Sequence, residues 1–406
     1  MVERRVVVTG VGSITSLGHN SRECWQSLCE GRSGVGLIEE VDRAQLRFQN
    51  GAQVRDFSTG DHFDDKEANQ LDRFAVLGLV AAREAISNAG IAWTPELKEE
   101  TAIITGSCLG GKISEDVVFA DFYSKTSSRA HPLSIPRAMS NAAASRISLE
   151  FGITGPTYNV STACASSNHA IGQAFHTVRN GAAEVAITGG SEAPFTLGHL
   201  KMWEGLRVVA PDVCRPFSKD RRGMILAEGG AMLVIETLNG AERRGAKIYA
   251  EIVGFGMSSD AHHLTQPFSE GAARAMRAAL RDAGIEPEQI GYINAHGTGT
   301  QVNDAMETKA IRSLFGDHSE RLMISSTKSM HGHALGAAGA IEAVATVLAL
   351  HHGKLPPTAN YTEPDPECDL DVIPNEARNK QVEYALSNSF AFGGLNAVLV
   401  FKRWND

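Results

Sequence analysis

The stretch that decides the fold is Val160-Ser161-Thr162-Ala163-Cys164-Ala165-Ser166-Ser167, which places a cysteine between a strand-like segment and a helix. Residues 158–160 read as the strand, and a pattern of small residues over 170–181 reads as the helix. A cysteine at such a junction meets the free N–H groups and the dipole of a helix N-terminus, which favour an anion. We therefore expect a lowered pKa for the Cys164 thiol and a nucleophilic role for its thiolate.

The same cysteine has a second interpretation. Free cysteine is among the most buried residue types, so Cys164 can equally be an inert structural thiol. The stretch alone does not separate the two interpretations. Histidines later in the chain favour the nucleophile.

The composition limits the class of protein. A chain of 406 residues with 43% hydrophobic residues can bury a sizeable core. Its 47 acidic residues outnumber 38 basic ones, so we expect no nucleic-acid partner. Six cysteines without a CxxC pair fit a reducing compartment, and we expect a cytoplasmic location. The apolar run after Arg5 is short, and we expect neither a signal peptide nor a membrane span.

Apolar runs, most of them followed by glycine, alternate with helical patterns along the chain. These runs predict strands at 5–10, 102–106, 185–190, 232–235, 250–256, 290–295, 322–325, 384–387 and 397–401. Helical periodicity followed by glycine predicts helices over 71–89, 271–283 and 335–352. Because the alternation begins again near residue 249, we expect an α/β fold of two similar halves, 1–248 and 249–406, the first carrying Cys164.

One segment of the first half lacks a clear period. Residues 112–152 have a loose pattern with two prolines, and we expect an insertion that covers the active site or meets a partner subunit.

Three loops of the second half carry histidine or glycine where an expected strand ends. They are Asn294-Ala295-His296-Gly297-Thr298-Gly299-Thr300, Thr327-Lys328-Ser329-Met330-His331-Gly332-His333 and Asn388-Ser389-Phe390-Ala391-Phe392-Gly393-Gly394. In α/β proteins, catalytic groups gather at the carboxyl ends of strands. Cys164 and two histidines can therefore meet in one cavity.

These motifs resemble those of the β-ketoacyl-acyl carrier protein synthases of the I/II type, and the resemblance covers essentially the whole chain. It rests on residues 162–167, 294–300 and 328–333 and on Phe392-Gly393-Gly394. Residues 207–218 and 364–372 look like the nodulation-protein-E branch, whose members make unusual acyl chains.

The resemblance implies a thiolase-like fold of five layers, αβαβα, usually in a homodimer, with a heterodimer with a paralogue as the other assembly. It implies an acyltransferase that condenses a Cys164-bound acyl group with malonyl-acyl carrier protein by decarboxylation, in fatty acid or specialised acyl-chain biosynthesis. The substrates travel on the phosphopantetheine of an acyl carrier protein, and neither a further cofactor nor a catalytic metal is implied. The alternatives are a non-catalytic chain-length partner, which typically lacks the nucleophile, and a thiolase, which needs a second cysteine motif.

The resemblance also implies roles for single residues. Neutral His296 and His333 would direct Nε2–H groups at the enolate, and the N–H groups of Cys164 and Phe392 would form an oxyanion hole. Lys328 would be a further catalytic residue, tied to a supporting Glu307 and ordering the site through its charge. The remaining implied roles are support by Thr298 and Thr300, a gate at Phe392, an acyl-pocket wall at Leu109, and a monovalent-cation site found in some members at Asn294, Glu342, Ser387 and Asn388.

The sequence departs from the family pattern at three positions. His331 stands where threonine is usual, so we assign the catalytic role to His333. Ala391 replaces a glycine and Leu395 a threonine beside the gate, which changes the flexibility of that loop. Docking of an acidic carrier is expected to use basic residues such as Lys66, Arg73, Arg137 and Arg207.

Overall fold

The computed structural model describes residues 4–39 and 41–405. The strands of its central sheet are β1 (Val6–Thr15), β4 (Thr101–Gly106), β5 (Thr157–Val160), β6 (Val185–Glu192), β7 (Gly229–Thr237), β8 (Ala250–Ser259), β9 (Ile290–Asn294), β10 (Met323–Ser325), β13 (Tyr384–Ala391) and β14 (Leu395–Arg403). Every strand expected from the apolar runs is present. Two small ribbons lie outside this sheet and pair β2 (Gly36–Leu37) with β3 (Asn50–Gly51) and β11 (Lys354–Leu355) with β12 (Arg378–Asn379).

The helices occupy the segments between these strands. In chain order they are α1 (Ser21–Cys29), α2 (Asp65–Ala68), α3 (Arg73–Ala89), α4 (Pro95–Glu99), α5 (Lys112–Tyr123), α6 (Ser134–Ala138), α7 (Ala142–Phe151), α8 (Ser166–Arg179), α9 (Leu197–Leu206), α10 (Leu238–Arg243), α11 (Ser269–Ala283), α12 (Gln301–Phe315), α13 (Lys328–His331) and α14 (Ala338–His352). The expected glycine stops are confirmed at Gly90, Gly284 and Gly353, which end α3, α11 and α14 in the left-handed conformation that glycine adopts without strain.

The sheet has two halves that meet at β1 and β8. Its strand order is β10-β9-β13-β14-β8-β1-β7-β6-β4-β5, so strands of the first part of the chain lie on one side of that junction and later strands on the other. The junction is short, because only Val6, Val7 and Val8 of β1 pair with β8. Within each half the carboxyl ends of the parallel strands point to the same edge of the sheet.

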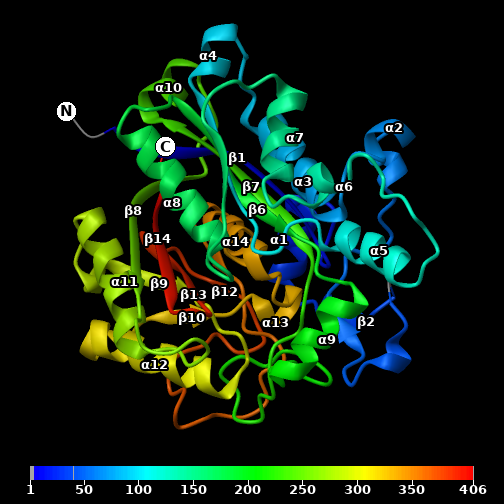
Figure 1. The fold of residues 1–406 in the computed structure, drawn as a ribbon. Helices are drawn as coiled ribbons and strands as arrows, with labels where there is room; N and C mark the ends of the chain where they lie inside the picture. Colours follow the sequence, from blue (N-terminus) through cyan, green and yellow to red (C-terminus); the bar gives the residue numbers. More distant parts are fainter. Residues whose placement is uncertain (1–3, 40, 406) are drawn as a thin grey trace.

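Helices fill five alternating layers with the two halves of the sheet. Helices α3 and α7 cover the outer face of the first half, and α11, backed by α12, covers the outer face of the second. Between the halves lie α8 and α14, which pack on strands of both, as Figure 1 shows. The expected αβαβα arrangement of an α/β protein is confirmed.

The central helix α14 explains the apolar alanine-rich run of the sequence. One described segment, Leu335–His352, is long and apolar enough to cross a membrane, but 89% of it is buried inside the protein. That burial is what a core helix between two sheet halves requires.

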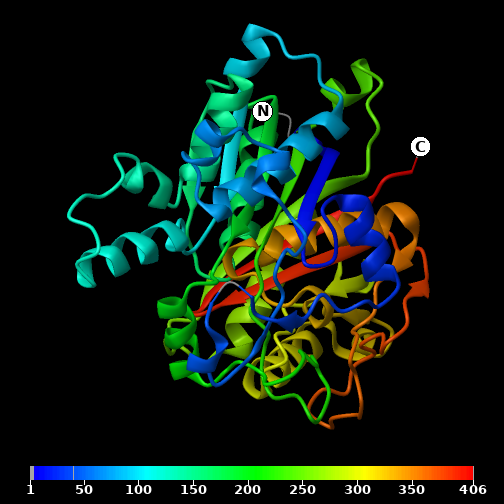
Figure 2. The ribbon, with the colours of Figure 1, turned by 90° about the vertical axis from the view of Figure 1, so that its right-hand side faces the viewer.

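The segment without a clear sequence period, residues 112–152, is largely helical. Helices α5 and α6 stand out from the body of the molecule (Figure 2), and α7 returns to the sheet. Apolar side chains on the projecting part remain exposed, including Tyr123 at 81% and Ile135 at 74%. Because its apolar residues face solvent rather than the core, their spacing along the sequence gave no helical signal.

Candidate active site

The nucleophile candidate is presented by a strained turn. Cys164 lies in the loop between β5 and α8, and Ala163 before it has a φ of 49°, in the left-handed region that costs a residue with a side chain about 1–3 kcal/mol. Small residues surround the cysteine, so its thiol reaches a cavity of about 510 Å³. The same cavity is lined by His296, His333 and Phe392.

The thiol of Cys164 is held in its protonated form, contrary to the lowered pKa expected at a helix N-terminus. Burial raises the pKa of Cys164 to about 11. The charge of Lys328 and the backbone N–H groups of Phe392 and of Cys164 itself act in the opposite direction and only partly compensate. The expectation failed because α8 begins two residues later, at Ser166, and because desolvation outweighs the helix end.

The two backbone N–H groups that approach the sulfur are those expected to form an oxyanion hole. Phe392 lies in the turn between β13 and β14, and its ring stacks on Trp203 with centroids 6.2 Å apart. The ring of Phe392 therefore stands at the cavity wall, while its N–H points to Cys164. Leu109 packs in the same apolar cluster as Phe392 but does not line the cavity.

His296 follows β9, and its protonation is defined by Lys328. The Nζ of Lys328 lies 3.4 Å from the Nδ1 of His296. Because an ammonium group can only donate, Nδ1 must accept, and this assigns the hydrogen of the neutral ring to Nε2. Burial, and then the charge of Lys328, holds the pKa of His296 well below its usual range.

His333 has the same tautomer for a different reason. The backbone N–H of Leu335 donates to the Nδ1 of His333 over 3.1 Å, so the hydrogen of this ring also lies on Nε2. Burial is the main cause that keeps its pKa well below the usual range, followed by Lys328. The rings of His296 and His333 are 5.5 Å apart and nearly perpendicular. The cavity thus contains two neutral N–H donors.

The expected tie between Lys328 and Glu307 is wrong. Lys328 forms a fully buried ion pair with Glu342 of α14. Glu307 instead accepts the backbone N–H groups of His296 and Gly297, at 2.9 and 2.8 Å, and thereby fixes the histidine loop. Sequence spacing cannot distinguish these carboxylates, because both lie on helices that pack behind the loops.

His331 does not share the cavity with Cys164. Its Nε2 lies 3.0 Å from the hydroxyl of Thr327, and its Nδ1 is buried without a partner. The ring lines a separate small cavity together with Ser13 and Cys24. Burial lowers the pKa of His331 to about 3.

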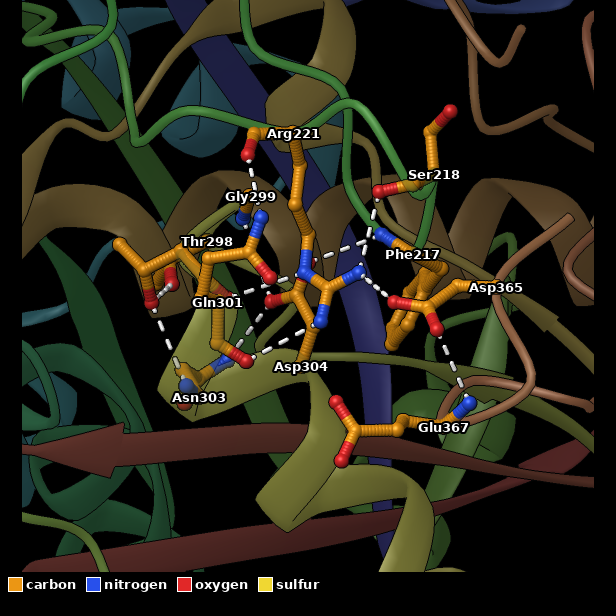
Figure 3. Close-up of polar contacts among 12 residues, drawn as sticks. Phe217, Ser218, Arg221, Thr298, Gly299, Gln301, Asn303, Asp304, Asp365 and Glu367 are labelled. Carbon is orange, nitrogen blue, oxygen red and sulfur yellow. Dashed lines mark hydrogen bonds and ion pairs between the residues drawn. The ribbon is translucent and has the colours of Figure 1, made fainter. Parts of the chain in front are cut away.

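A buried ionic network holds the loop that follows His296 (Figure 3). Arg221 pairs with Asp304 and Asp365 and donates to the carbonyl oxygens of Thr300 and Gln301. This network was not expected from the sequence, where Arg221 is one of several arginines in a polar segment. It fixes the part of the cavity wall where Thr298 and Thr300 hydrogen-bond to each other over 3.0 Å.

The residues proposed for a cation site carry unused oxygens. Buried oxygens of Glu342, Ser387 and Asn388 have no hydrogen-bond partner, and Asn294 pairs with Ser387 across β9 and β13. Oxygen donors with one carboxylate suit a hard cation of low charge. These residues fit the site that the resemblance implies.

Two of the basic residues expected to dock a carrier can now be placed. Arg207 lines the cavity that holds Cys164. Arg73 pairs instead with the buried carboxylate of Glu228, 2.7 Å away, and is mostly buried. Arg73 is therefore a structural residue.

One functional candidate was missed by the sequence analysis. Glu192 is fully buried at the carboxyl end of β6 and contacts the loop after β4. A charged residue that ends a buried strand, after two glycines, was the available signal.

A cysteine with two backbone N–H groups near its sulfur and two neutral histidine donors in the same cavity fits the class of enzymes that carry an acyl group on a thiol. The chain belongs to the β-ketoacyl synthase family. Residues 3–241 match the beta-ketoacyl synthase N-terminal domain, and residues 249–362 match the C-terminal domain. It is therefore a condensing enzyme of the acyltransferase type.

Curated relatives match over nearly the whole chain. Nodulation protein E of Rhizobium sp. (strain N33) is 46% identical over 99% of this chain and 100% of its own length. The 3-oxoacyl-[acyl-carrier-protein] synthase 2 of Staphylococcus aureus (strain COL) is 41% identical over 99% of each chain.

Solved structures agree with the fold. The ishigamide ketosynthase/chain length factor has a TM-score of 0.95 and 37% identity, with full coverage of both chains. A type II PKS ketosynthase, solved in complex with its acyl-carrier protein, has a TM-score of 0.89 and 31% identity, covering 99% of this chain and 100% of its own.

Proposed function

We propose that this protein elongates an acyl chain by two carbons, condensing an acyl group on Cys164 with a malonyl group delivered by acyl carrier protein. The observation that carries the proposal is the single cavity in which Cys164 meets the Nε2–H donors of His296 and His333. The family and the relatives support the reaction class.

In the first step the sulfur of Cys164 attacks the thioester carbon of an acyl-carrier. A carbon–sulfur bond to Cys164 forms, the bond to the carrier breaks, and the carrier leaves as a thiol with the proton that Cys164 gives up. The N–H groups of Cys164 and Phe392 stabilise the oxyanion of the tetrahedral intermediate. A thiol of high pKa stays protonated, and so protected from side reactions, until the substrate is bound.

In the second step a malonyl-carrier occupies the cavity and loses carbon dioxide. The electron pair of the broken carbon–carbon bond becomes an enolate, whose oxygen accepts the N–H donors of His296 and His333. The enolate carbon attacks the acyl group, and the thiolate of Cys164 leaves and takes up a proton. Neutral histidines suit this step because each donates a hydrogen bond from Nε2–H and does not take a proton from the substrate.

The site supports this assignment over the two alternatives. A non-catalytic chain-length partner has no use for a cysteine with two donors on its sulfur and two oriented histidines. A thiolase needs a second cysteine placed to exchange protons, but among the described residues Cys164 is the one cysteine that lines this cavity.

The proposal extends to partners and location. The substrates arrive on phosphopantetheine, which belongs to the carrier, so we assign no organic cofactor to the enzyme itself. A monovalent cation at Glu342, Ser387 and Asn388 would add positive charge near Lys328. The exposed apolar side chains of α5 and α6, together with the edge strand β5, support a homodimer, with a paralogue as the alternative second chain. A cytoplasmic location is supported by six free cysteines.

The pathway is proposed from the relatives. Nodulation protein E of Rhizobium sp. (strain N33), at 46% identity, is more similar to this chain than synthase 2 of Staphylococcus aureus, at 41%, which favours a specialised acyl chain over housekeeping fatty acid synthesis.

The test is condensation by the purified protein with a panel of acyl carriers of different length and unsaturation plus malonyl carrier. We expect a β-ketoacyl product two carbons longer and one carbon dioxide per product. Cys29→Ser, a change at the end of α1, is the matched control and should retain activity. Absence of product with every acyl carrier tested, from protein of native mass and fold, would refute the proposal.

A further inference from the structure

The two halves of the protein are connected next to the active site by one buried carboxylate, that of Glu192. Its Oε1 accepts the hydroxyl of Ser107 at 2.9 Å and the backbone N–H of Leu109 at 3.2 Å. Its Oε2 accepts the backbone N–H of Cys108 at 2.9 Å and that of Gly336 at 3.1 Å. The first three donors belong to the loop after β4, and the fourth belongs to the second half of the chain.

Glu192 is stabilised as a carboxylate without a cation. It is fully buried, and among the residues that the structure describes no lysine, arginine or histidine forms an ion pair with it. Four donors occupy its two oxygens, which leaves no natural position for a proton. Burial raises the pKa of Glu192 above its usual value, and the hydrogen bonds from Ser107 and from backbone N–H groups, which favour the ionised form, offset this rise only in part.

The donor from the second half lies directly beside a catalytic histidine. Gly336 is in the 3₁₀ turn η5 (Leu335–Ala337), whose first residue donates its N–H to the Nδ1 of His333. The carbonyl of Gly336 also accepts the hydroxyl of Ser167, in the first turn of α8, three residues after Cys164. One turn is thus bound to both the nucleophile's helix and the carboxylate.

The approach at this point is too close for any side chain on the turn. A Cβ on Gly336 would lie 2.4 Å from the Oε2 of Glu192 and 2.5 Å from the backbone nitrogen of Cys108. Real Cβ atoms do not approach heavy atoms so closely, so the glycine is required by the contact between the halves.

We propose that Glu192 is a positioning residue that ties the loop after β4 to the turn after His333, and so holds the nucleophile of one half in register with the histidine donor of the other. It touches neither substrate nor the reacting atoms. Its effect on the reaction passes through Gly336 and Leu335 to the Nε2–H of His333.

Glu192 also acts on Cys164 through its charge. The charged groups that influence this thiol are Lys328, which lowers its pKa, and Glu192, which raises it. Cys108, which is itself influenced by Cys164, is held as a thiol by burial and by Glu192. His296 and His333 are neutral, so they add no charge to this balance.

These two effects change two measurements in opposite directions: the rate of decarboxylation should fall, and the reactivity of the Cys164 thiol should rise. The second measurement does not depend on the proposed function. In Glu192→Gln, the amide cannot accept from all four donors, and His333 loses its alignment. We expect malonyl-carrier decarboxylation to fall about 10- to 100-fold, the range for outer partners of functional histidines. Alkylation of Cys164 by iodoacetamide should move to lower pH, because the negative charge is removed.

Two further variants make the test selective. Gly336→Ala breaks the same contact from the other half but keeps the charge, so decarboxylation should fall while the alkylation profile stays in place. Glu236→Gln is the matched control, since Glu236 is a buried carboxylate at the opposite end of the same β6–β7 ladder. It should leave both readouts as in the parent.

The inference rests on the proposed function only for the decarboxylation readout. If the parent protein does not decarboxylate malonyl carrier, the proposed function fails, and the alkylation profiles still test Glu192. If Glu192→Gln matches Glu236→Gln in both readouts, Glu192 is an ordinary structural residue and the inference is overturned. The inference is also overturned if Glu192→Gln lowers the rate of Cys164 alkylation together with the rate of decarboxylation.

Discussion

The two halves of the protein contribute to the same cavity by different means. The first half presents Cys164 on a strained turn, with its own backbone N–H near the sulfur, and holds the buried carboxylate of Glu192 by hydrogen bonds from backbone N–H groups and a hydroxyl. The second half contains a buried cation, Lys328, paired with Glu342. A further buried network joins Arg221 of the first half to Asp304 and Asp365 of the second. Near the cavity, the buried charge of the first half, Glu192, is thus held by hydrogen bonds, whereas that of the second half, Lys328, is held by an ion pair.

The difference follows from what each half must hold. A group that becomes an oxyanion at the moment of reaction needs neutral dipoles, whose effect is local. Two histidines that must stay neutral gain from a nearby positive charge, which disfavours their protonation. Lys328, buried and paired with Glu342, supplies that charge.

Replacement of the nucleophile breaks the first half's contribution, and the largest effect is expected there. Cys164→Ser should abolish condensation, because an alcohol at neutral pH is far less nucleophilic than a thiol that can form a thiolate. Intact mass spectrometry after incubation with an acyl carrier should find an adduct on the parent and none on the variant. An adduct that maps to Cys108 or Cys214 would contradict this assignment.

The contribution of the second half is tested at His333. His333→Ala should slow malonyl decarboxylation roughly 10²- to 10³-fold, the effect of removing one donor to a developing oxyanion. His331→Thr should remain competent, because His331 faces a different cavity. Rates of carbon dioxide release measure both variants, and equal losses would show that the loop after β10 has been misinterpreted.

The next prediction concerns the turn at Phe392, where the second half of the protein reaches the cysteine of the first half. Ala391 and Leu395 form the last pair of β13 and β14, on either side of Phe392. Ala391→Gly with Leu395→Thr should change the ratio of kcat/KM for short and long acyl carriers by about 1–3 kcal/mol, the range for reshaping an apolar pocket. We expect selectivity to change more than rate, since neither side chain supplies a catalytic group. An unchanged chain-length profile would show that these positions do not control entry.

The smallest expected effect is on stability, and it concerns His331, the histidine of this loop that lies outside the cavity of Cys164. The pKa of His331 is about 3 in the folded protein and about 6.5 in an unfolded chain. Between these values the unfolded chain binds one more proton, so stability falls as the pH drops below 6.5. The loss at pH 5 is about 2 kcal/mol, which His331→Thr should remove.

Urea unfolding at pH 7 and pH 5 measures this effect. If His331→Thr loses as much stability between the two pH values as the parent, His331 is not the group that titrates.

Much of the fold was readable from the sequence because its signals are local. Apolar runs followed by glycine predicted the strands of the central sheet, and glycines 90, 284 and 353 predicted three helix ends. The projecting helices α5 and α6 were missed, because their apolar residues do not follow the pattern of a buried face.

The site was predictable in part. Motifs at strand ends indicated Cys164, His296 and His333, and the structure brings all three to one cavity. The partner of Lys328, the raised pKa of Cys164 and the role of Glu192 depend on contacts between segments far apart in the chain. Tertiary packing decides which carboxylate pairs with a buried lysine and how far a thiol is desolvated, and a short sequence motif does not contain that information.

The central claim is that one half holds the acyl group and the other generates the enolate, and one measurement tests it most directly. His333→Ala is loaded with an acyl carrier and then given malonyl carrier, and the intact mass of the protein is followed in time beside the parent and His331→Thr. We predict that all three proteins acquire the acyl adduct on Cys164, and that only His333→Ala keeps it after malonyl carrier is added. If His333→Ala fails to form the adduct, or clears it as fast as the parent, the division of labour between the halves is wrong.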